Sequence, residues 1–365
     1  MQDVTTWEEL DKIRNGLSGE YRLTQDLTTE DSGYAEYAGE SANGGSGWNP
    51  IGGSPLASNN EDPFTGVFDG NGYSINGVVV DQPEDTNVGL FGGTDSNSTV
   101  KDVSITDISI AGNDKVGAVV GCCQGTVSGV AANGDVTADT DAGGIAGRIS
   151  SGDGGVPPGE VTKSYTTVTV IARDDIGLNL GGLTGLSTGV ISQSFAAGSI
   201  GGTSFVGGLA GIAFGTVEDS YATSELTANG VDIGGLIGSL DGELKRSYAV
   251  GTGPNVEGGL VGNAESGPTV EESYYFQGPN NGNGTQLEQA DMQGEEPPKA
   301  GNMEGFDFTT TWETVTGDGN AAEPSYPILT AVPREAQLSD REILQTQTPP
   351  TAPTNLKVSL PFTDG

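Results

Sequence analysis

The segment Gly207-Gly208-Leu209-Ala210-Gly211 recurs along the chain in close variants, and this recurrence decides the fold. Six further segments share its pattern of glycines around aliphatic residues: Val88–Gly92, Gly117–Gly121, Gly143–Gly147, Gly181–Gly185, Gly234–Gly238 and Gly258–Gly262. The final glycines are Gly92, Gly121, Gly147, Gly185, Gly211, Gly238 and Gly262, separated by 29, 26, 38, 26, 27 and 24 residues. A near-constant period of this size indicates a protein built from stacked structural repeats.

A second motif, a serine followed by an aromatic residue, keeps the same period. It occurs as Ser164-Tyr165, Ser194-Phe195, Ser220-Tyr221, Ser247-Tyr248 and Ser273-Tyr274. The glycine density excludes helices, because each interior glycine costs about 1 kcal/mol relative to alanine. Each unit has room for about three short strands. We therefore predict an all-β, right-handed parallel β-helix with coils of about 26 residues, in which glycines supply positive φ at tight corners and the aliphatic residues fill the interior.

The two ends of such a stack need covers, because open strand edges invite aggregation. Residues 5–17 have the capping pattern and apolar spacing of a short amphipathic helix, which would close the N-terminal end. The sequence predicts four parts: residues 1–87, an N-terminal cap and coil entry; 88–276, the repeats; 277–347, a C-terminal cap; and 348–365, a proline-rich linker with the start of a further β domain.

The glycine motif and the Ser-Tyr-Ala motif together resemble those of the GLUG-motif repeat proteins. Trp48–Gly52 and Tyr326–Leu329 extend the resemblance over roughly residues 5–330, although Gly129-Val130-Ala131 departs from it. The resemblance implies a part of a large surface adhesin, a phage fibre or an accessory region of a secreted protein. Residues 349–358 resemble the opening strand of a fibronectin type III domain, which implies a longer modular parent.

The composition is strongly acidic: 50 Asp and Glu against 14 Lys and Arg, with no His, give a formal net charge of −36. Such a surface repels phosphates and anionic lipids, so we expect neither a nucleic-acid partner nor membrane insertion. Salt screens this self-repulsion, which favours a protein of a hypersaline medium. We expect it outside the cell, on a cell surface or on a virion. No cofactor is expected. Binding of structural Ca²⁺ or of monovalent cations by the carboxylates is the alternative. Cys122 and Cys123 are predicted to point one inward and one outward.

Two features are candidate binding sites. The aromatic row of Tyr165, Phe195, Tyr221, Tyr248 and Tyr274 would serve as a platform for sugar rings if it points outward, and as a core ladder if it points inward. The 38-residue interval contains an insertion at residues 152–159, and its Asp153 and Gly154 would lie on a protruding loop.

Paired carboxylates are the candidate catalytic groups, because glycoside hydrolysis needs two of them at roughly 5–9 Å. The candidates are Asp174 with Asp175, Asp139 with Asp141, and Asp102 with Asp107. We interpret them as surface acids, and the absence of His removes the usual triads. The sequence thus predicts no enzyme.

The predicted function is a structural and adhesive module, either a virion fibre or spike or a haloarchaeal cell-surface adhesin. Its expected partners are a cell-surface glycan or glycoprotein, other subunits of the same particle or surface layer, and copies of itself, for example in a trimer. A carbohydrate-active β-helix enzyme and a pure structural spacer are the alternatives.

Overall fold

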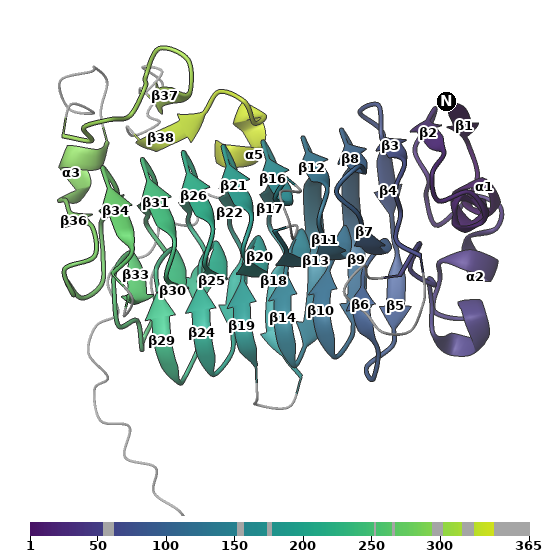
Figure 1. The fold of residues 1–365 in the computed structure, drawn as a ribbon, viewed down its shortest axis with the longest axis horizontal. Helices are drawn as coiled ribbons and strands as arrows, with labels where there is room; N and C mark the ends of the chain where they lie inside the picture. Colours follow the sequence, from purple (N-terminus) through teal and green to yellow (C-terminus); the bar gives the residue numbers. More distant parts are fainter. Residues whose placement is uncertain are drawn as a thin grey trace, which may run out of the picture.

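The protein is a parallel β-solenoid of about seven turns, which confirms the predicted all-β class (Figure 1). The structure is a computed structural model and describes residues 1–53, 62–151, 157–173, 177–251, 253–264, 267–293, 302–315 and 325–338. The strands of successive coils lie side by side along the long axis. Every strand pair of the solenoid is parallel in the described residues, and the hairpin of β37 and β38 is antiparallel.

Four sheets form the sides of the solenoid. Sheet A contains β1 (Gln2–Val4), β2 (Glu20–Leu23), β3 (Val67–Asp69), β8 (Thr99–Lys101), β12 (Thr126–Ser128), β16 (Glu160–Thr162), β21 (Val190–Ser192), β26 (Thr216–Glu218), β31 (Glu243–Lys245) and β34 (Thr269–Glu271). Sheet C contains β7 (Phe91–Thr94), β11 (Val120–Cys123), β15 (Ala146–Ile149), β20 (Thr184–Ser187), β25 (Ala210–Ala213), β30 (Ile237–Leu240) and β33 (Val261–Asn263). Sheet D contains β6 (Thr86–Val88), β10 (Asp114–Gly117), β14 (Thr140–Gly143), β19 (Leu178–Gly181), β24 (Ser204–Gly207) and β29 (Val231–Gly234).

Sheet B carries the aromatic row and is the most divided of the four. It contains β4 (Ser74–Asn76), β5 (Val79–Asp81), β9 (Ser104–Ala111), β13 (Ala131–Ala138), β17 (Tyr165–Thr166), β18 (Thr169–Ala172), β22 (Phe195–Ala196), β23 (Ser199–Gly201), β27 (Tyr221–Ala222), β28 (Glu225–Leu226), β32 (Tyr248–Ala249), β35 (Tyr274–Tyr275) and β36 (Thr285–Gln286). In the later coils, two short strands replace the single long strand of β9 or β13.

Each full coil therefore passes through four sheets, and the prediction of about three strands per coil was wrong. The glycine motif itself contains the missing corner. In Gly143–Gly147, for example, β14 ends at Gly143 and β15 begins at Ala146. A segment that looked like one strand is thus two strands from different sheets.

The repeat glycines also act differently from the prediction. In the described part of the chain the seven final glycines of the motif all lack positive φ. Glycine is needed there because no space exists for a side chain. A Cβ on Gly185 would lie 2.4 Å from the backbone nitrogen of Ala142 in the preceding coil. A Cβ on Gly147 would lie 2.3 Å from the carbonyl carbon of Lys115. Close contact between sheets C and D therefore requires glycine there.

Positive φ at the corners comes mainly from residues with side chains. One such residue lies in sheet D in each of six coils, and a second column lies at the corner between sheets A and B, where one coil has Gly129 instead. The first column is Asn87, Lys115, Asp141, Asn179, Phe205 and Asp232, and the second is Asp102, Lys163, Gln193, Asp219, Arg246 and Glu272. Asn and Asp tolerate this conformation better than other residues with side chains, which explains part of the selection.

The motif serines form a buried column that joins the coils. The Oγ of Ser220 accepts a hydrogen bond from the backbone N–H of Ser194 in the coil before, at 3.2 Å, and donates to the carbonyl of Glu218 at 2.8 Å. The same pair of bonds recurs at Ser164, Ser194, Ser247 and Ser273. Each serine thus satisfies a buried N–H that the corner leaves outside the strand ladder.

The predicted N-terminal helix is present and shorter. Helix α1 (Trp7–Asp11) continues into the 3₁₀ helix η1 (Lys12–Asn15). Thr6 caps it by accepting from the N–H of Glu9, whose carboxylate accepts from the N–H of Thr5. Trp7 is fully buried and packs against Trp48. Helix α2 (Tyr34–Tyr37) and η2 (Ala42–Gly45) follow within the same end of the molecule (Figure 1).

The C-terminal part was predicted to be a cap. In the structure it covers the last coil and also a side of the solenoid. Residues 277–286 cover the last coil: the side-chain N–H of Asn281 donates to the carbonyls of Val261 and Gly262. The following residues 287–293, 302–315 and 325–338, here called the strap, turn back along the side of the solenoid (Figure 1). The strap contains α3 (Gln289–Met292), β37 (Trp312–Val315), β38 (Ser325–Leu329) and α5 (Arg334–Leu338). In the described residues, the helices are all too short or too polar to cross a membrane.

Candidate functional site: the aromatic ladder and the strap

The aromatic row points away from the solenoid interior. In the two-residue strands β22, β27 and β32 of sheet B, the second residue, Ala196, Ala222 or Ala249, belongs to the main core. Because neighbouring side chains of a strand point to opposite faces, the first residue of each pair faces outward. Phe195 and Tyr221 accordingly belong to a second apolar cluster, separate from the main core.

The rings are stacked on one another along the solenoid. The ring centres are 5.2 Å apart for Tyr165 and Phe195, 4.9 Å for Phe195 and Tyr221, and 4.8 Å for Tyr221 and Tyr248. The interplanar angles are only 5°, 4° and 2°. The distance between ring centres is close to the distance between neighbouring parallel strands, because adjacent rings belong to paired residues of adjacent strands. We call these rings, with Tyr274, the aromatic ladder.

This geometry gives the aromatic row a role different from either predicted alternative. A sugar platform needs exposed ring faces. Within the stack each ring face lies against the next ring, so only ring edges and hydroxyl groups point away from the solenoid. Phe195, Tyr221 and Tyr248 are also buried at 1%, 1% and 0% exposure, and Tyr274 at 6%. The row points outward and is nevertheless a core, because the strap covers it.

The strap contributes apolar side chains and hydrogen-bond acceptors to this second core. The hydroxyl of Tyr248 donates to the carbonyl of Pro327 at 2.5 Å, and that of Tyr274 to the carbonyl of Glu304 at 3.2 Å. The hydroxyl of Tyr221 bonds to Oε1 of the buried Gln337 at 3.0 Å. The strap side chains of the cluster are Met292, Met303, Phe306, Trp312, Tyr326, Leu329 and Val332.

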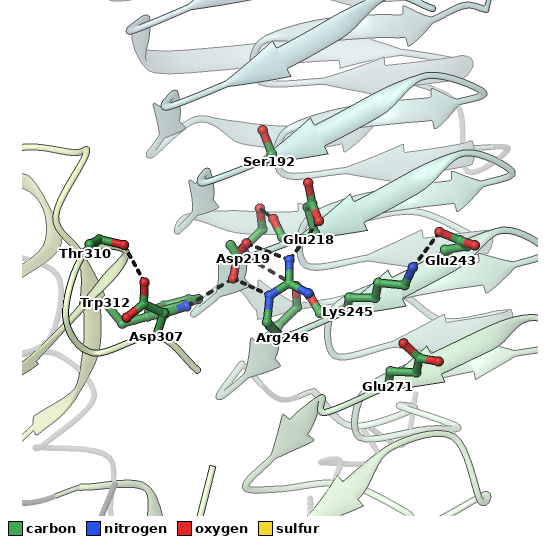
Figure 2. Close-up of polar contacts among 12 residues, drawn as sticks. Ser192, Glu218, Asp219, Glu243, Lys245, Arg246, Glu271, Asp307, Thr310 and Trp312 are labelled. Carbon is green, nitrogen blue, oxygen red and sulfur yellow. Dashed lines mark hydrogen bonds and ion pairs between the residues drawn. The ribbon is translucent and has the colours of Figure 1, made fainter. Parts of the chain in front are cut away.

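An arginine clamp lies at the corner between sheets A and B (Figure 2). Its residues Asp219 and Arg246 each precede a ladder tyrosine by two positions. The guanidinium of Arg246 bonds both carboxylate oxygens of Asp219 at 2.9 Å and the carboxylate of Glu218 at 2.7 Å. These carboxylates raise the pKa of Arg246, the hydrogen bond to Asp219 contributing most. The indole N–H of Trp312 approaches Oδ1 of Asp219 at 3.4 Å, so the clamp also orients an acceptor toward the strap.

The strap's own polar turn lies next to this clamp in Figure 2. The carboxylate of Asp307 accepts from the N–H of Thr309 at 2.8 Å and from the hydroxyls of Thr309 and Thr310. These hydrogen bonds, chiefly those from the two threonine side chains, lower the pKa of Asp307 to about 2. The turn therefore keeps its negative charge down to strongly acidic pH.

The predicted carboxylate pairs lie in separate local contacts. Asp139 pairs with Arg173 at 2.5 Å, whereas the fully buried Asp141 pairs with Arg148 and accepts from Asn179 at 2.7 Å. Burial raises the pKa of Asp141 against these two partners. Asp102 pairs with Lys101, and Asp107 accepts from Asn76. Asp174 and Asp175, like Asp153 and Gly154 of the insertion, lie outside the described residues.

The adjacent cysteines are both fully buried. Cys123 belongs to the main core, as predicted for the inward residue, and burial raises its pKa to about 12. The Cys122 sulfur lies 3.8 Å from the hydroxyl of Ser150 and is covered, contrary to the exposed position that an outward thiol suggests. Within the described ranges, no three Cys, Asp or Glu residues gather as a metal site would require.

Sequence reasoning missed the docking of the strap and the arginine clamp. Residues 277–347 were predicted as a C-terminal cap, but the aromatic row was not predicted as the partner of Phe306, Trp312 and Tyr326. One signal was available. A row of aromatic residues on the outer face of a strand, in a chain this polar, requires a cover from elsewhere in the sequence.

Comparison with known proteins gives two partial relatives, and the sequence matches no protein-family model. The chain is 38% identical to halomucin of Haloquadratum walsbyi over 112 residues. The matched segment covers 30% of this chain and 1% of halomucin. It is 33% identical over 132 residues to a protein of Evansella cellulosilytica named "Putative Gly-rich membrane protein". That matched segment covers 35% of this chain and 14% of the Evansella protein. The chain thus spans a small part of each relative. The GLUG resemblance is not confirmed, and the fibronectin-like tail lies outside the described residues.

Among solved structures, the solenoid is similar to a Bacteroides ovatus protein described as a "putative immunoglobulin A1 protease". The TM-score is 0.53 at 17% sequence identity, over 90% of this chain and 92% of that chain. At this identity the likeness shows the fold alone. It corrects the prediction that the chain is not an enzyme, because a protein with this fold carries the name of a protease. The architecture gives no ground for excluding catalysis.

Proposed function

We propose that the chain is a rigid structural module of a surface protein that works in concentrated salt and contacts glycans or proteins of neighbouring surfaces. The observation that carries this proposal is the in-register stack of acidic coils. Coil after coil repeats the same backbone pairing, as between Val217 and Leu244 or between Tyr221 and Tyr248. Such a stack transmits length and stiffness without needing a globular core.

The charge supports a setting in strong brine. A net charge of −36 on 365 residues opposes compaction unless salt shortens the range of repulsion, from roughly 30 Å at 0.01 M to roughly 3 Å at 1 M. The partial likeness to halomucin of Haloquadratum walsbyi and to a protein named as a membrane protein favours a cell surface over a virion. Adhesion and assembly with other copies are the finer part of the proposal.

Localisation on intact cells tests the proposal directly. Antibodies raised against the purified chain would be applied to producing cells kept at their working salt concentration, before and after permeabilisation. We expect labelling of intact cells, and loss of that label after mild surface proteolysis. Labelling that appears only after permeabilisation would contradict a surface role.

Adhesion is tested separately from display. Beads coated with the purified chain would be mixed with the same cells and with isolated cell-surface glycans in high salt. Retention that soluble chain competes away supports a binding role. Display on the cell without any retention would reduce the proposal to a spacer.

A further inference from the structure

The strap and the solenoid carry charge of the same sign. The described strap residues include six acids, Glu288, Asp291, Glu304, Asp307, Glu313 and Glu335, and one base, Arg334, which gives 1 − 6 = −5. The solenoid is also acidic, and the carboxylate of Glu272 in its last coil lies against Gly305 of the strap. Docking therefore brings two negative bodies together, and the apolar contact of the second core must overcome their repulsion.

Ion pairs do not offset this repulsion across the contact. Among the described residues, each ion pair lies either within the solenoid or within the strap. Arg334 pairs with Glu313, both in the strap, while Arg246 pairs with Glu218 and Asp219, all in the solenoid. The polar bonds that do cross the contact come mainly from uncharged donors, the hydroxyls of Tyr221, Tyr248 and Tyr274 and the indole of Trp312.

The strap and the solenoid each place one acid near Tyr274, namely Glu304 and Glu272. The carboxylate of Glu272 packs against the strap backbone so closely that a Cβ on Gly305 would lie 1.8 Å from its Oε2. The charges of Glu304 and Glu272 both act on the phenol of Tyr274, whose pKa is raised mainly by burial and further by these two groups. A strap carboxylate and a solenoid carboxylate thus share one small region.

The two cores differ greatly in size. The second core contains six buried residues of the solenoid and seven of the strap, whereas the main core runs through every coil from Val4 to Tyr275. Salt strengthens apolar burial and screens repulsion together. The smaller core, which joins two like-charged parts, is the one that dilution of salt should open first.

We propose that the strap is a salt-controlled closure, docked on the aromatic ladder in concentrated salt and detached in dilute salt while the solenoid remains folded. Detachment uncovers the edges and hydroxyls of the stacked rings. A protein of this kind would present an acidic rod in brine and an aromatic, self-adhesive side after dilution.

Hydrogen exchange followed by mass spectrometry tests this on the full chain without any mutation. Exchange would be measured at KCl concentrations from about 3 M down to about 0.1 M, a range over which the screening length changes from roughly 3 Å or less to roughly 10 Å. Strap peptides from 302–315 and 325–338 would be compared with solenoid peptides from 204–251. We expect the strap amides to lose protection at a KCl concentration at which the solenoid amides keep theirs. Loss of protection in both regions at one concentration, or a strap protected at every concentration, would overturn the proposal.

Charge neutralisation supplies the matched variants. Glu288, Glu304 and Glu335 are exposed strap acids, and their triple change to Gln should lower the KCl midpoint of strap protection by about twofold or more, since less repulsion needs less screening. The control triple, Glu30→Gln, Asp81→Asn and Asp135→Asn, removes the same charge from exposed positions outside the strap and the ladder. An equal shift in both triples would show an effect of net charge alone and would refute a closure specific to the strap.

Discussion

At the scale of the residue, the solenoid depends on what its repeat positions exclude as much as on what they bury. Gly185 lies against the backbone of the coil before, where a methyl group in place of its hydrogen would come within 2.4 Å of the Ala142 nitrogen. Backbone cannot rotate away as a flexible side chain can. The glycine is therefore selected by space and not by its freedom at positive φ.

Gly185→Ala should lower the free energy of unfolding by about 1–3 kcal/mol, because the methyl group forces two coils apart. Ser239→Ala is the matched control: it lies half-exposed in β30 of the same sheet and should stay within about 0.5 kcal/mol of the parent. Chemical denaturation in high salt would measure both. A neutral Gly185→Ala would show that the coils can separate without cost.

The buried serine column gives a second prediction at this scale. Ser220→Ala removes the acceptor of the Ser194 N–H and should cost about 1–3 kcal/mol, since the buried N–H loses its partner. Ser192→Ala removes only a half-exposed bond to the Thr162 hydroxyl and should cost less than half as much. Equal costs, compared in the same denaturation experiment, would argue against the column.

At the scale of the element, the strap and the ladder behave as one unit joined by tyrosine hydroxyls. The ladder presents its edges, so the hydroxyls at those edges are the groups that reach the strap carbonyls. Tyr275 follows Tyr274 directly but faces the main core, and its hydroxyl is buried without a hydrogen-bond partner among the described residues. Neighbouring tyrosines thus have opposite energetic roles.

Tyr248→Phe should weaken strap docking by about 1 kcal/mol, because the Pro327 carbonyl loses its donor. Tyr275→Phe should leave stability unchanged or raise it slightly, since it removes a buried hydroxyl that has no partner among the described residues. Hydrogen exchange of strap and solenoid peptides separates the two effects. A strap that exchanges at the same rate in Tyr248→Phe as in the parent would contradict the assigned role of that hydroxyl.

At the scale of the whole molecule, stability should follow the rules of a linear stack, in which each coil contacts its neighbours. Asp114 of β10 pairs with Thr140 of β14 in register, so the residues from Asp114 to Asp139 make up one period. This coil lies outside the part of the ladder that the strap covers.

Deletion of residues 114–139 should give a shorter protein that still folds cooperatively, because Thr140 then takes the place of Asp114 against β6. Deletion of residues 114–125 removes β10 and β11 but keeps β12 and β13, so one coil loses two of its four sides, and this variant should not fold cooperatively. Circular dichroism and thermal unfolding in high salt distinguish these outcomes. Equal behaviour of the two deletions would contradict a register-dependent stack.

The sequence by itself determined the architecture. A period of about 26 residues, with glycine and serine at fixed places, specifies parallel coils because each residue must meet its equivalent in the next coil. It also showed the N-terminal helix through its capping pattern, the acidic surface through composition, and the aromatic row through its phase. The sequence did not show that the glycine motif spans a corner, because the apolar residues of the motif run continuously from the end of one strand into the start of the next.

Only the tertiary structure decided what the aromatic row does. Its partners lie far away along the chain: Tyr248 and Pro327 are 79 residues apart, Asp219 and Trp312 are 93, and Tyr221 and Gln337 are 116. Contacts within the solenoid repeat and can be read from the period. Those with the strap occur once each and follow no period, because they depend on where a non-repeating segment folds back against the stack.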